Sequence, residues 1–343
     1  MSGRKQHYIP QMLLRGFSSA GVGKKKQVFV YKRSQPPFSV STEGIAAQRE
    51  FYSPTSSAKG ESLDDAITHY EQKILSPALT TMRSAPNGAI VERDIVSEAI
   101  NHLTIRNAQV RNIAGDAMVR TLSNILDCIS IPSEAQRLLG LAGVEVGPHI
   151  RKALETFWED NKQALSLKGF DEDGFFKFAS ALVKDTFPQQ HQNIISNITP
   201  VLSVLISSVP QITASSHIKA LTQGIAPPVR TSKLAEFEWR VHDAPNLILS
   251  DCIAIARLGD DWLPLTLIGT DGVENIFVPI NSMRAVIGSR HALNVPSDPR
   301  TALALSASEF FVAPGRSKEL ETLSSRIGSV TSDAIERMST FHF

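Results

Sequence analysis

The sequence predicts an α+β protein, predominantly helical, with a long central helix and a C-terminal antiparallel sheet joined by the N-terminal strand. Apolar residues recur at helical spacing before Pro227, most clearly over residues 92–129. After Pro228 the chain changes to short β-branched and aromatic runs separated by turn residues. Helices followed by a run of strands are typical of α+β domains.

The N-terminal region is expected to hold a short helix and one strand. Pro10 suits the first turn of a helix, and Gly16 suits its end. Residues 27–33 (QVFVYKR) read as a strand, because β-branched and aromatic side chains favour extended backbone. Residues 38–52 are expected to be extended but irregular.

Helices are then expected as far as Gln223. The first covers residues 63–82 and bends at Pro77. Residues 92–129 are expected to form one long helix, since Val96, Ala99 and Leu103 begin a heptad-like series. The shorter helices that follow are predicted over residues 133–141, 147–165, 171–187 and 190–208.

Five strands and two helices are predicted for the C-terminal part. Pro264 confines the third strand to a sheet edge or an irregular segment. The strands are expected over residues 236–243, 246–257, 262–268, 275–280 and 283–288. The closing helices are expected over residues 300–311 and 318–338.

Bulk properties point to a soluble cytoplasmic protein without a membrane partner. The formal net charge of the 343 residues is +1, which gives no general basic excess for nucleic acid. Polar residues precede Pro10, where a secretory signal would be apolar. Residues 198–209 are interrupted by Pro200 and look too short to span a bilayer. Cys128 and Cys252 lie far apart and suit reduced thiols.

Three charged residues fall on predicted apolar faces. Glu71 and Arg106 lie three or four positions from apolar neighbours on their helices. Asp251 shares a face with Leu249 and Ile253 in a predicted strand, because every second side chain points to the same side. Such side chains are seldom fully buried without a partner.

Two interpretations of these charges stay open. Glu71 and Arg106 can form a buried ion pair that joins two helices. Alternatively, both converge with Asp251, His7 and Arg15 on one polar pocket, since perturbed ionisable groups cluster at functional sites. No HExxH, CxxC, GxSxG or GxGxxG motif occurs, so the sequence assigns no cofactor and leaves any metal unknown.

The opening segment reads His7-Tyr8-Ile9-Pro10 followed by Leu14-Arg15-Gly16-Phe17, and the later segments Phe51-Tyr52 and Ile276-Phe277-Val278-Pro279 stand farther along the chain. In these segments the sequence resembles the DUF4238 family. The chain departs from the family pattern at Cys252-Ile253, where a turn proline is common. The resemblance implies that both ends of the chain meet in a single domain over 1–343, with 133–223 as an insertion or subdomain.

The resemblance brings no established reaction, so the functional hypotheses come from the charged residues. The first is a hydrolase, a nuclease or phosphodiesterase acting on a phosphate ester or nucleic acid, as in bacterial phage-conflict effectors. His7 would transfer protons, Arg15 and Arg106 would hold an anion, and Glu71 and Asp251 would orient them. The alternative is a non-catalytic module that senses an anionic small molecule or binds a protein, with a structural polar network.

Overall fold

The chain divides into two compact units. A computed structural model describes residues 5–19, 26–52 and 62–339. The first unit comprises Met1–Gly115 and Pro210–Arg337, and the second comprises Asp116–Val209 and Met338–Phe343. The predicted insertion at 133–223 overlaps the second unit, whose main segment begins and ends earlier. Residues 1–4, part of the polar segment that argued against a secretory signal, lie outside the described residues.

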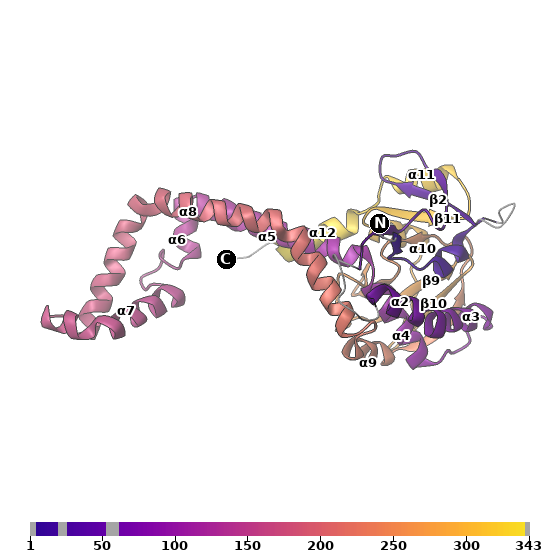
Figure 1. Ribbon diagram of the computed structural model, residues 1–343, viewed down its shortest axis with the longest axis horizontal. Helices are drawn as coiled ribbons and strands as arrows, with labels where there is room; N and C mark the ends of the chain where they lie inside the picture. The colour runs from indigo at the N-terminus through magenta and orange to yellow at the C-terminus, as the bar shows by residue number, and fades with distance from the viewer. Residues whose placement is uncertain (1–4, 20–25, 53–61, 340–343) are drawn as a thin grey trace. The chain divides into compact units, whose positions relative to one another are not determined.

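The described residues of the first unit form three antiparallel sheets among helices, which confirms the α+β class (Figure 1). The five-stranded sheet has the order β5 (Glu238–Asp243), β10 (Arg284–Ser289), β9 (Asn275–Asn281), β7 (Ile255–Leu258) and β8 (Asp261–Pro264). The four-stranded sheet has the order β3 (Phe38–Ser41), β2 (Gln27–Lys32), β11 (Phe310–Ala313) and β6 (Leu249–Ser250). A two-stranded ribbon pairs β1 (Lys5–His7) with β4 (Ala47–Arg49).

The predicted strand at 27–33 is confirmed as β2, but its sheet differs from the predicted one. It pairs with β11 and β3 in the four-stranded sheet, and it does not join the five-stranded C-terminal sheet. The inward residues of β2, Val28 and Val30, belong to the same apolar core as Ile276 and Phe277 of β9. One continuous core therefore serves both sheets.

The predicted strand at 246–257 is wrong in its middle, where the chain leaves one sheet for the other. β6 ends at Ser250 and β7 begins at Ile255. Asp251 therefore lies at a corner, and the prediction that it shares a strand face with Leu249 is wrong. Ile253 has φ 65°, a strained value for a β-branched residue, and its side chain is fully buried there.

Helices of the first unit surround these sheets, with α3 and α4 against β9 and β5 and α11 against β2. The N-terminal helices are α1 (Gln11–Leu14), η1 (Arg15–Phe17), α2 (Leu63–Tyr70), the π-helix η2 (Glu71–Leu75), α3 (Ser76–Ser84) and α4 (Arg93–Ile105). The C-terminal helices are α9 (Pro228–Ala235), α10 (Pro299–Ser306), α11 (Lys318–Ser324) and α12 (Ser329–Ser339), the last of which crosses the division between the units.

Two predicted C-terminal helices are interrupted. The helix expected at 300–311 ends at Ser306, and Phe310 to Ala313 form the fully buried strand β11 between β2 and β6. Its aromatic and β-branched side chains suit that central position. The helix expected at 318–338 is divided at Gly328, whose φ of 81° is incompatible with a continuing helix.

The long helix predicted over 92–129 is wrong, because it breaks between α4 and α5 (Ala108–Ser130). Arg106 is the C-cap residue of α4, and the next residue, Asn107, is not helical. The Asn107 Oδ1 accepts a hydrogen bond from the Gln109 backbone N–H at 3.0 Å, and its Nδ2 donates to the Asp251 backbone carbonyl. Asparagine thus competes with helix continuation through local side-chain bonds.

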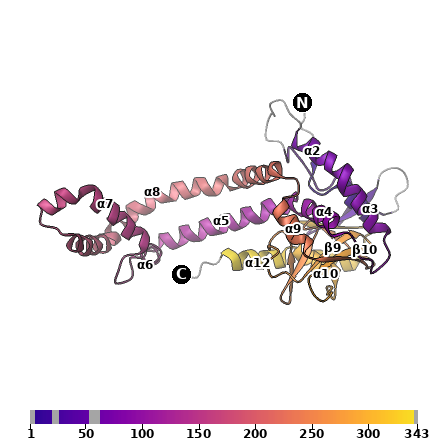
Figure 2. The same ribbon diagram turned by 90° about the horizontal axis from the view of Figure 1, so that it is seen from below.

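The second unit is helical and contains α6 (Pro132–Leu138), α7 (Pro148–Leu167) and most of α8 (Glu172–Gln223). Both views place α6 and α7 beside the N-terminal part of α8 (Figures 1 and 2). A small core joins Ala135 and Leu141 to Phe187, and another joins Trp158 to Phe175.

The helix α8 corrects two predictions. The expected helices at 171–187 and 190–208 form one helix of 52 residues that continues through Pro188 and Pro200. A proline removes one helical hydrogen bond, and an exposed helix can leave the freed carbonyl to water. Among the described helices, α8 alone is long and apolar enough to cross a membrane by length and composition, so the prediction that this region is too short was wrong.

The packing of Trp239 against the five-stranded sheet leaves no room for a side chain at position 288. A Cβ at this position would lie 2.7 Å from Cζ3 of the buried Trp239 ring, so Gly288→Ala is expected to lower the free energy of unfolding by about 1–3 kcal/mol. Chemical denaturation followed by tryptophan fluorescence measures the change. The control is Gly315→Ala, where the added Cβ has no neighbour within 4 Å. Equal stability of the two variants would contradict the close contact.

Candidate functional site

The opening segment is part of the core of the first unit. Ile9, Leu13, Leu14 and Phe17 have no exposed surface and belong to the main core. Pro10 precedes α1, and its carbonyl accepts the first helical hydrogen bonds from Leu13 and Leu14. The family-like motif therefore anchors the N-terminus, and its polar members are held on a fixed framework.

Gly16 is required where the opening segment meets β9. A Cβ there would lie 2.9 Å from the Ile280 carbonyl oxygen and 2.6 Å from Nη2 of Arg83. The Arg83 guanidinium donates to the carbonyls of Ile280 and Met12, so it ties the segment to the sheet. Only glycine permits this close approach.

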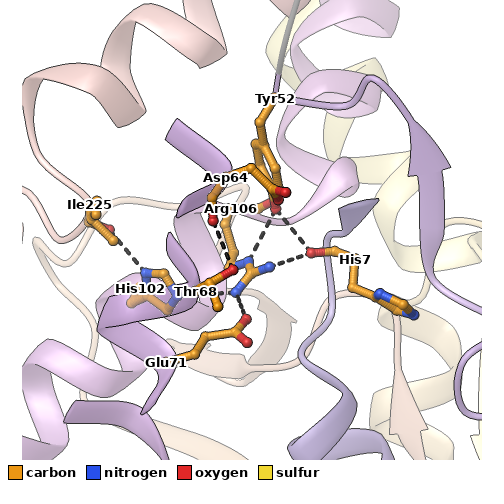
Figure 3. A network of polar contacts seen from close by, with 8 residues as sticks. All are labelled: His7, Tyr52, Asp64, Thr68, Glu71, His102, Arg106 and Ile225. Carbon is orange, nitrogen blue, oxygen red and sulfur yellow. Dashed lines mark hydrogen bonds and ion pairs between the residues drawn. The ribbon is translucent and has the colours of Figure 1, made fainter. Parts of the chain in front are cut away.

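Arg106 is the centre of a buried polar network (Figure 3). Its Nη1 pairs with the Glu71 carboxylate, and its Nη2 donates to the His7 backbone carbonyl. Its Nε donates to the Tyr52 hydroxyl at 3.1 Å. The Arg106 side chain is 2% exposed and the Glu71 side chain 19%. The predicted ion pair is thus present, and it also fixes the backbone at His7.

His102 completes the network from one helical turn before Arg106. Its Nε2 lies 3.2 Å from Nη1 of Arg106, and its Nδ1 lies 3.2 Å from the Ile225 carbonyl oxygen. A guanidinium can only donate, so Nε2 accepts and Nδ1 carries the proton. Burial, and secondarily the charge of Arg106, hold the pKa of His102 well below its usual value. This histidine is neutral and structural.

The charge on Arg106 is secured by its neighbours. Burial alone would lower the pKa of its guanidinium, but Tyr52 and the Glu71 carboxylate together raise it above the ordinary value. Four donor positions of the guanidinium are directed at Glu71, His102, Tyr52 and His7. Arg106 therefore has little capacity left to hold an external anion, the role that the sequence suggested.

The His7 imidazole points away from Arg106 (Figure 3). It lines a pocket of about 250 Å³ together with Gln11, Arg15, Glu71 and Gln72. The other lining residues are Met12 and Thr68. The pocket therefore combines the end of β1, the α1–η1 segment and the α2–η2 helix.

The π-helix η2 places Glu71 and Gln72 at this pocket. The N–H of Ser76 bonds to the Glu71 carbonyl, five residues back, immediately before Pro77. Because Pro77 has no N–H, the helix cannot form the ordinary bond from that position, and the wider turn occupies the step before it. The helix predicted over residues 63–82 thus contains a π-helical turn before Pro77. Isolated π turns are frequent at functional sites.

Two groups set the charge of the pocket. Arg15 is exposed, and its Nη2 donates to Oε1 of Gln11 at 2.9 Å. Burial is the largest influence on His7 and lowers the pKa of its imidazole, and the positive charges of Lys5 and Arg106 act in the same direction. A backbone hydrogen bond to Glu43 and the charge of Glu71 offset part of this. His7 is therefore neutral near pH 7 and can accept a proton.

Asp251 has a different set of partners from the other four predicted site residues. Its carboxylate accepts backbone N–H bonds from Ser308 at 2.8 Å, Glu309 at 2.7 Å and Phe310 at 3.3 Å. Burial raises the pKa of Asp251 to about 7, against the opposing effect of these N–H donors. Through these bonds Asp251 holds the start of β11 at the corner between the two sheets.

Sequence reasoning missed three contributors to this region. Gln11 lies four residues before Arg15, and His102 lies four residues before Arg106, so helical spacing could have signalled both. Tyr52 entered the argument only through the family resemblance. Its hydroxyl also donates to the His7 carbonyl at 3.2 Å.

Within the three described ranges, no group of three or more His, Cys, Asp or Glu side chains is placed to hold a metal ion. No curated protein and no solved structure matches this chain. One family does match, described as a protein of unknown function (DUF4238), and the match covers residues 5–313. Since it spans most of the 343 residues, including the opening segment and the Arg106 network, the chain belongs to the DUF4238 family.

Proposed function

We propose that the pocket beside His7 binds a small phosphate-bearing anion. The observation that carries this proposal is the exposed guanidinium of Arg15, in a pocket whose other charges are compensated. Arginine suits phosphate oxygens because its planar donors bind two oxygens at once.

The charges around the pocket favour an anion. Glu71 is neutralised by Arg106, and His7 is neutral because its pKa is lowered. Arg15 is then left as the net positive charge of the lining. The amides of Gln11 and Gln72 add groups that can donate to phosphate or accept from a sugar hydroxyl.

The size of the pocket favours a small molecule over a nucleic-acid strand. Its 250 Å³ lies just below the range of about 300–1,000 Å³ typical of sites for drug-sized ligands. A phosphate group with one attached sugar or nucleoside portion suits such a volume. The neutral overall composition, with a net charge of +1, also gives no extended track for a polyanion.

Replacing Arg15 with alanine is expected to weaken the binding of adenosine 5′-monophosphate by about tenfold or more, because a charge-assisted hydrogen bond contributes about 1.5–3 kcal/mol. Isothermal titration with this nucleotide, with inorganic phosphate and with a single-stranded RNA measures the affinities. The matched control is Arg33→Ala. Arg33 is also exposed, belongs to the same unit and directly follows β2.

Equal affinities of Arg15→Ala and wild type, or no binding of any of these probes, would overturn the anion-binding proposal. Tighter binding of the RNA than of the mononucleotide would identify nucleic acid, and not a small anion, as the ligand. Unchanged melting temperatures of both variants establish that any loss of affinity belongs to the pocket.

A second candidate is hydrolysis of a phosphate ester, by a phosphodiesterase or nuclease. It is favoured by the lowered pKa of His7, since a neutral imidazole can take a proton from an attacking water. Arg106 and Asp251 support it less, because their side chains are engaged within the protein. A role in phage conflict and a cytoplasmic location would suit either candidate.

Product formation separates the two candidates. The wild type and His7→Gln are incubated with bis(p-nitrophenyl) phosphate and with RNA, with added Mg²⁺ or Mn²⁺ and with chelator. Products that appear with wild type and vanish with His7→Gln would establish hydrolysis. Retained AMP binding without product in any condition would leave binding as the function.

A further inference from the structure

The helix α8 contains a long stretch without charge. No Asp, Glu, Lys or Arg occurs over residues 186–218, although much of this stretch is exposed. Only 11% of the most apolar window of α8 is buried within the protein. Ordinary surface helices carry charged residues on the side away from the core, so this stretch is unusual for a solvated surface.

The part of this stretch in the second unit exposes four large aliphatic side chains along one side. Ile198 is 37% exposed, Val201 59%, Val204 64% and Leu205 41%. At 100° per residue they fall within an arc of about 120°. We call these four residues the exposed seam.

The rest of the helix distinguishes the seam from the packed side. Val209 is buried, and Ile195, Leu202 and Ile206 are half-buried on the neighbouring arc. The opposite arc is polar and exposed and contains Ser196, Ser203 and Ser207. The helix is therefore apolar over a wider arc than its own unit covers.

We propose that the exposed seam pairs with the same seam of a second copy of this chain, forming a homodimer through α8. The spacing of Ile198, Val201 and Leu205 is three and four residues, the spacing of a and d positions in a coiled coil. Residues at this spacing stay on the contact line between two supercoiled helices.

The absence of charge favours a second copy over an unrelated protein. Heterologous helix partners are commonly selected by opposite charges beside the seam. Here neither Asp, Glu, Lys nor Arg stands beside it in the sequence between 186 and 218. A charged partner would have to bury its charges against the uncharged seam without a counterion, which is costly. A second copy of the chain offers an uncharged surface and avoids this cost.

The polar groups of α8 disfavour a lipid bilayer as the occupant. Gln189, Gln190 and Gln192 are exposed amides at the N-terminal side of the seam. Placing such groups in hydrocarbon costs several kcal/mol each without a partner, on the order of 2–7. The sequence of α8 also has no Trp or Tyr, which anchor spanning helices at both interfaces.

The test compares two double variants of the full chain by light scattering and sedimentation over a wide range of concentrations. Wild type is expected to show a dimer of twice 37.4 kDa that dissociates on dilution. Val201→Glu combined with Leu205→Glu is expected to weaken the dimer at least about tenfold, since it buries charges at the seam. Ser196→Glu combined with Ser203→Glu places the same charges on the polar arc and is expected to leave dimerisation unchanged.

Three outcomes would overturn the proposal. They are a monomeric wild type at every concentration, equal weakening by both double variants, and a monomer that floats with phosphatidylcholine vesicles through the seam. The circular dichroism melting curve of each variant confirms that it is folded. The exposed seam shares no residue with the His7 pocket. The double variant Val201→Glu and Leu205→Glu is therefore expected to bind AMP as wild type does, so failure of the dimer and failure of the proposed function can be told apart.

Discussion

Replacing Arg106 with alanine is expected to lower the free energy of unfolding of the first unit by about 3–5 kcal/mol. The substitution removes a guanidinium that is 2% exposed and leaves the partly buried Glu71 carboxylate without its ion pair. It also removes the donors that serve the Tyr52 hydroxyl and the His7 carbonyl. The loss is large because the Tyr52 hydroxyl is buried and the Glu71 carboxylate has only partial access to water.

Denaturation of the first unit can be followed separately by fluorescence. Trp239 is fully buried in the first unit, whereas Trp158 belongs to the second and is replaced by phenylalanine in every variant. Arg106→Lys keeps the charge but loses the planar fork, so a smaller yet clear loss of stability is expected. A change below about 1 kcal/mol for Arg106→Ala would contradict a structural role, since that is the range of an exposed ion pair.

The sequence supported the elements whose side-chain pattern is local. The strands β2, β5 and β9 follow β-branched and aromatic runs, and the structure confirms them within a few residues. The break after Arg106 was missed because it depends on Asn107 and its bond to the Asp251 carbonyl, which lies 144 positions away in the chain. Periodicity carries no signal for a contact of that kind.

The predicted site shows the same limit. Inward spacing correctly signalled the pair of Glu71 and Arg106, because both positions follow from helical periodicity. It could not show that the Arg106 donors would be used by a backbone carbonyl at His7 and a hydroxyl at Tyr52. Asp251 was assigned to a strand face, and its real partners are the backbone N–H groups that begin β11.

Lowering the pH from 6.5 to 4 is expected to destabilise the first unit through His217. Burial, together with the nearby charge of Arg111, lowers the pKa of His217 from 6.5 to about 4, although a hydrogen bond to the Ile105 carbonyl offsets part of this. Between these two pH values His217 is protonated in the unfolded chain but stays neutral in the folded chain. The free energy of unfolding therefore falls as the pH is lowered from 6.5 to 4. The difference corresponds to about 3 kcal/mol.

The substitution His217→Gln isolates this contribution. In wild type, Nδ1 of His217 accepts from Nε of Arg111 at 2.7 Å and Nε2 donates to the Ile105 carbonyl at 2.5 Å, and a glutamine amide offers one acceptor and one donor for the same partners. The change in unfolding free energy between pH 6.5 and 4 should differ between wild type and His217→Gln by about 3 kcal/mol, because acidification no longer destabilises the variant through this residue. His291→Gln, at an exposed histidine, should leave it unchanged.

The comparison must be made between variants because Asp251 acts in the opposite direction. Its pKa is raised to about 7, so the folded chain holds this proton more tightly and the associated stability falls as the pH rises toward 7. The wild-type curve adds both effects and can look flat. Only the difference between wild type and His217→Gln reports on the histidine, and parallel curves for the two proteins would show that His217 is not kept neutral by burial.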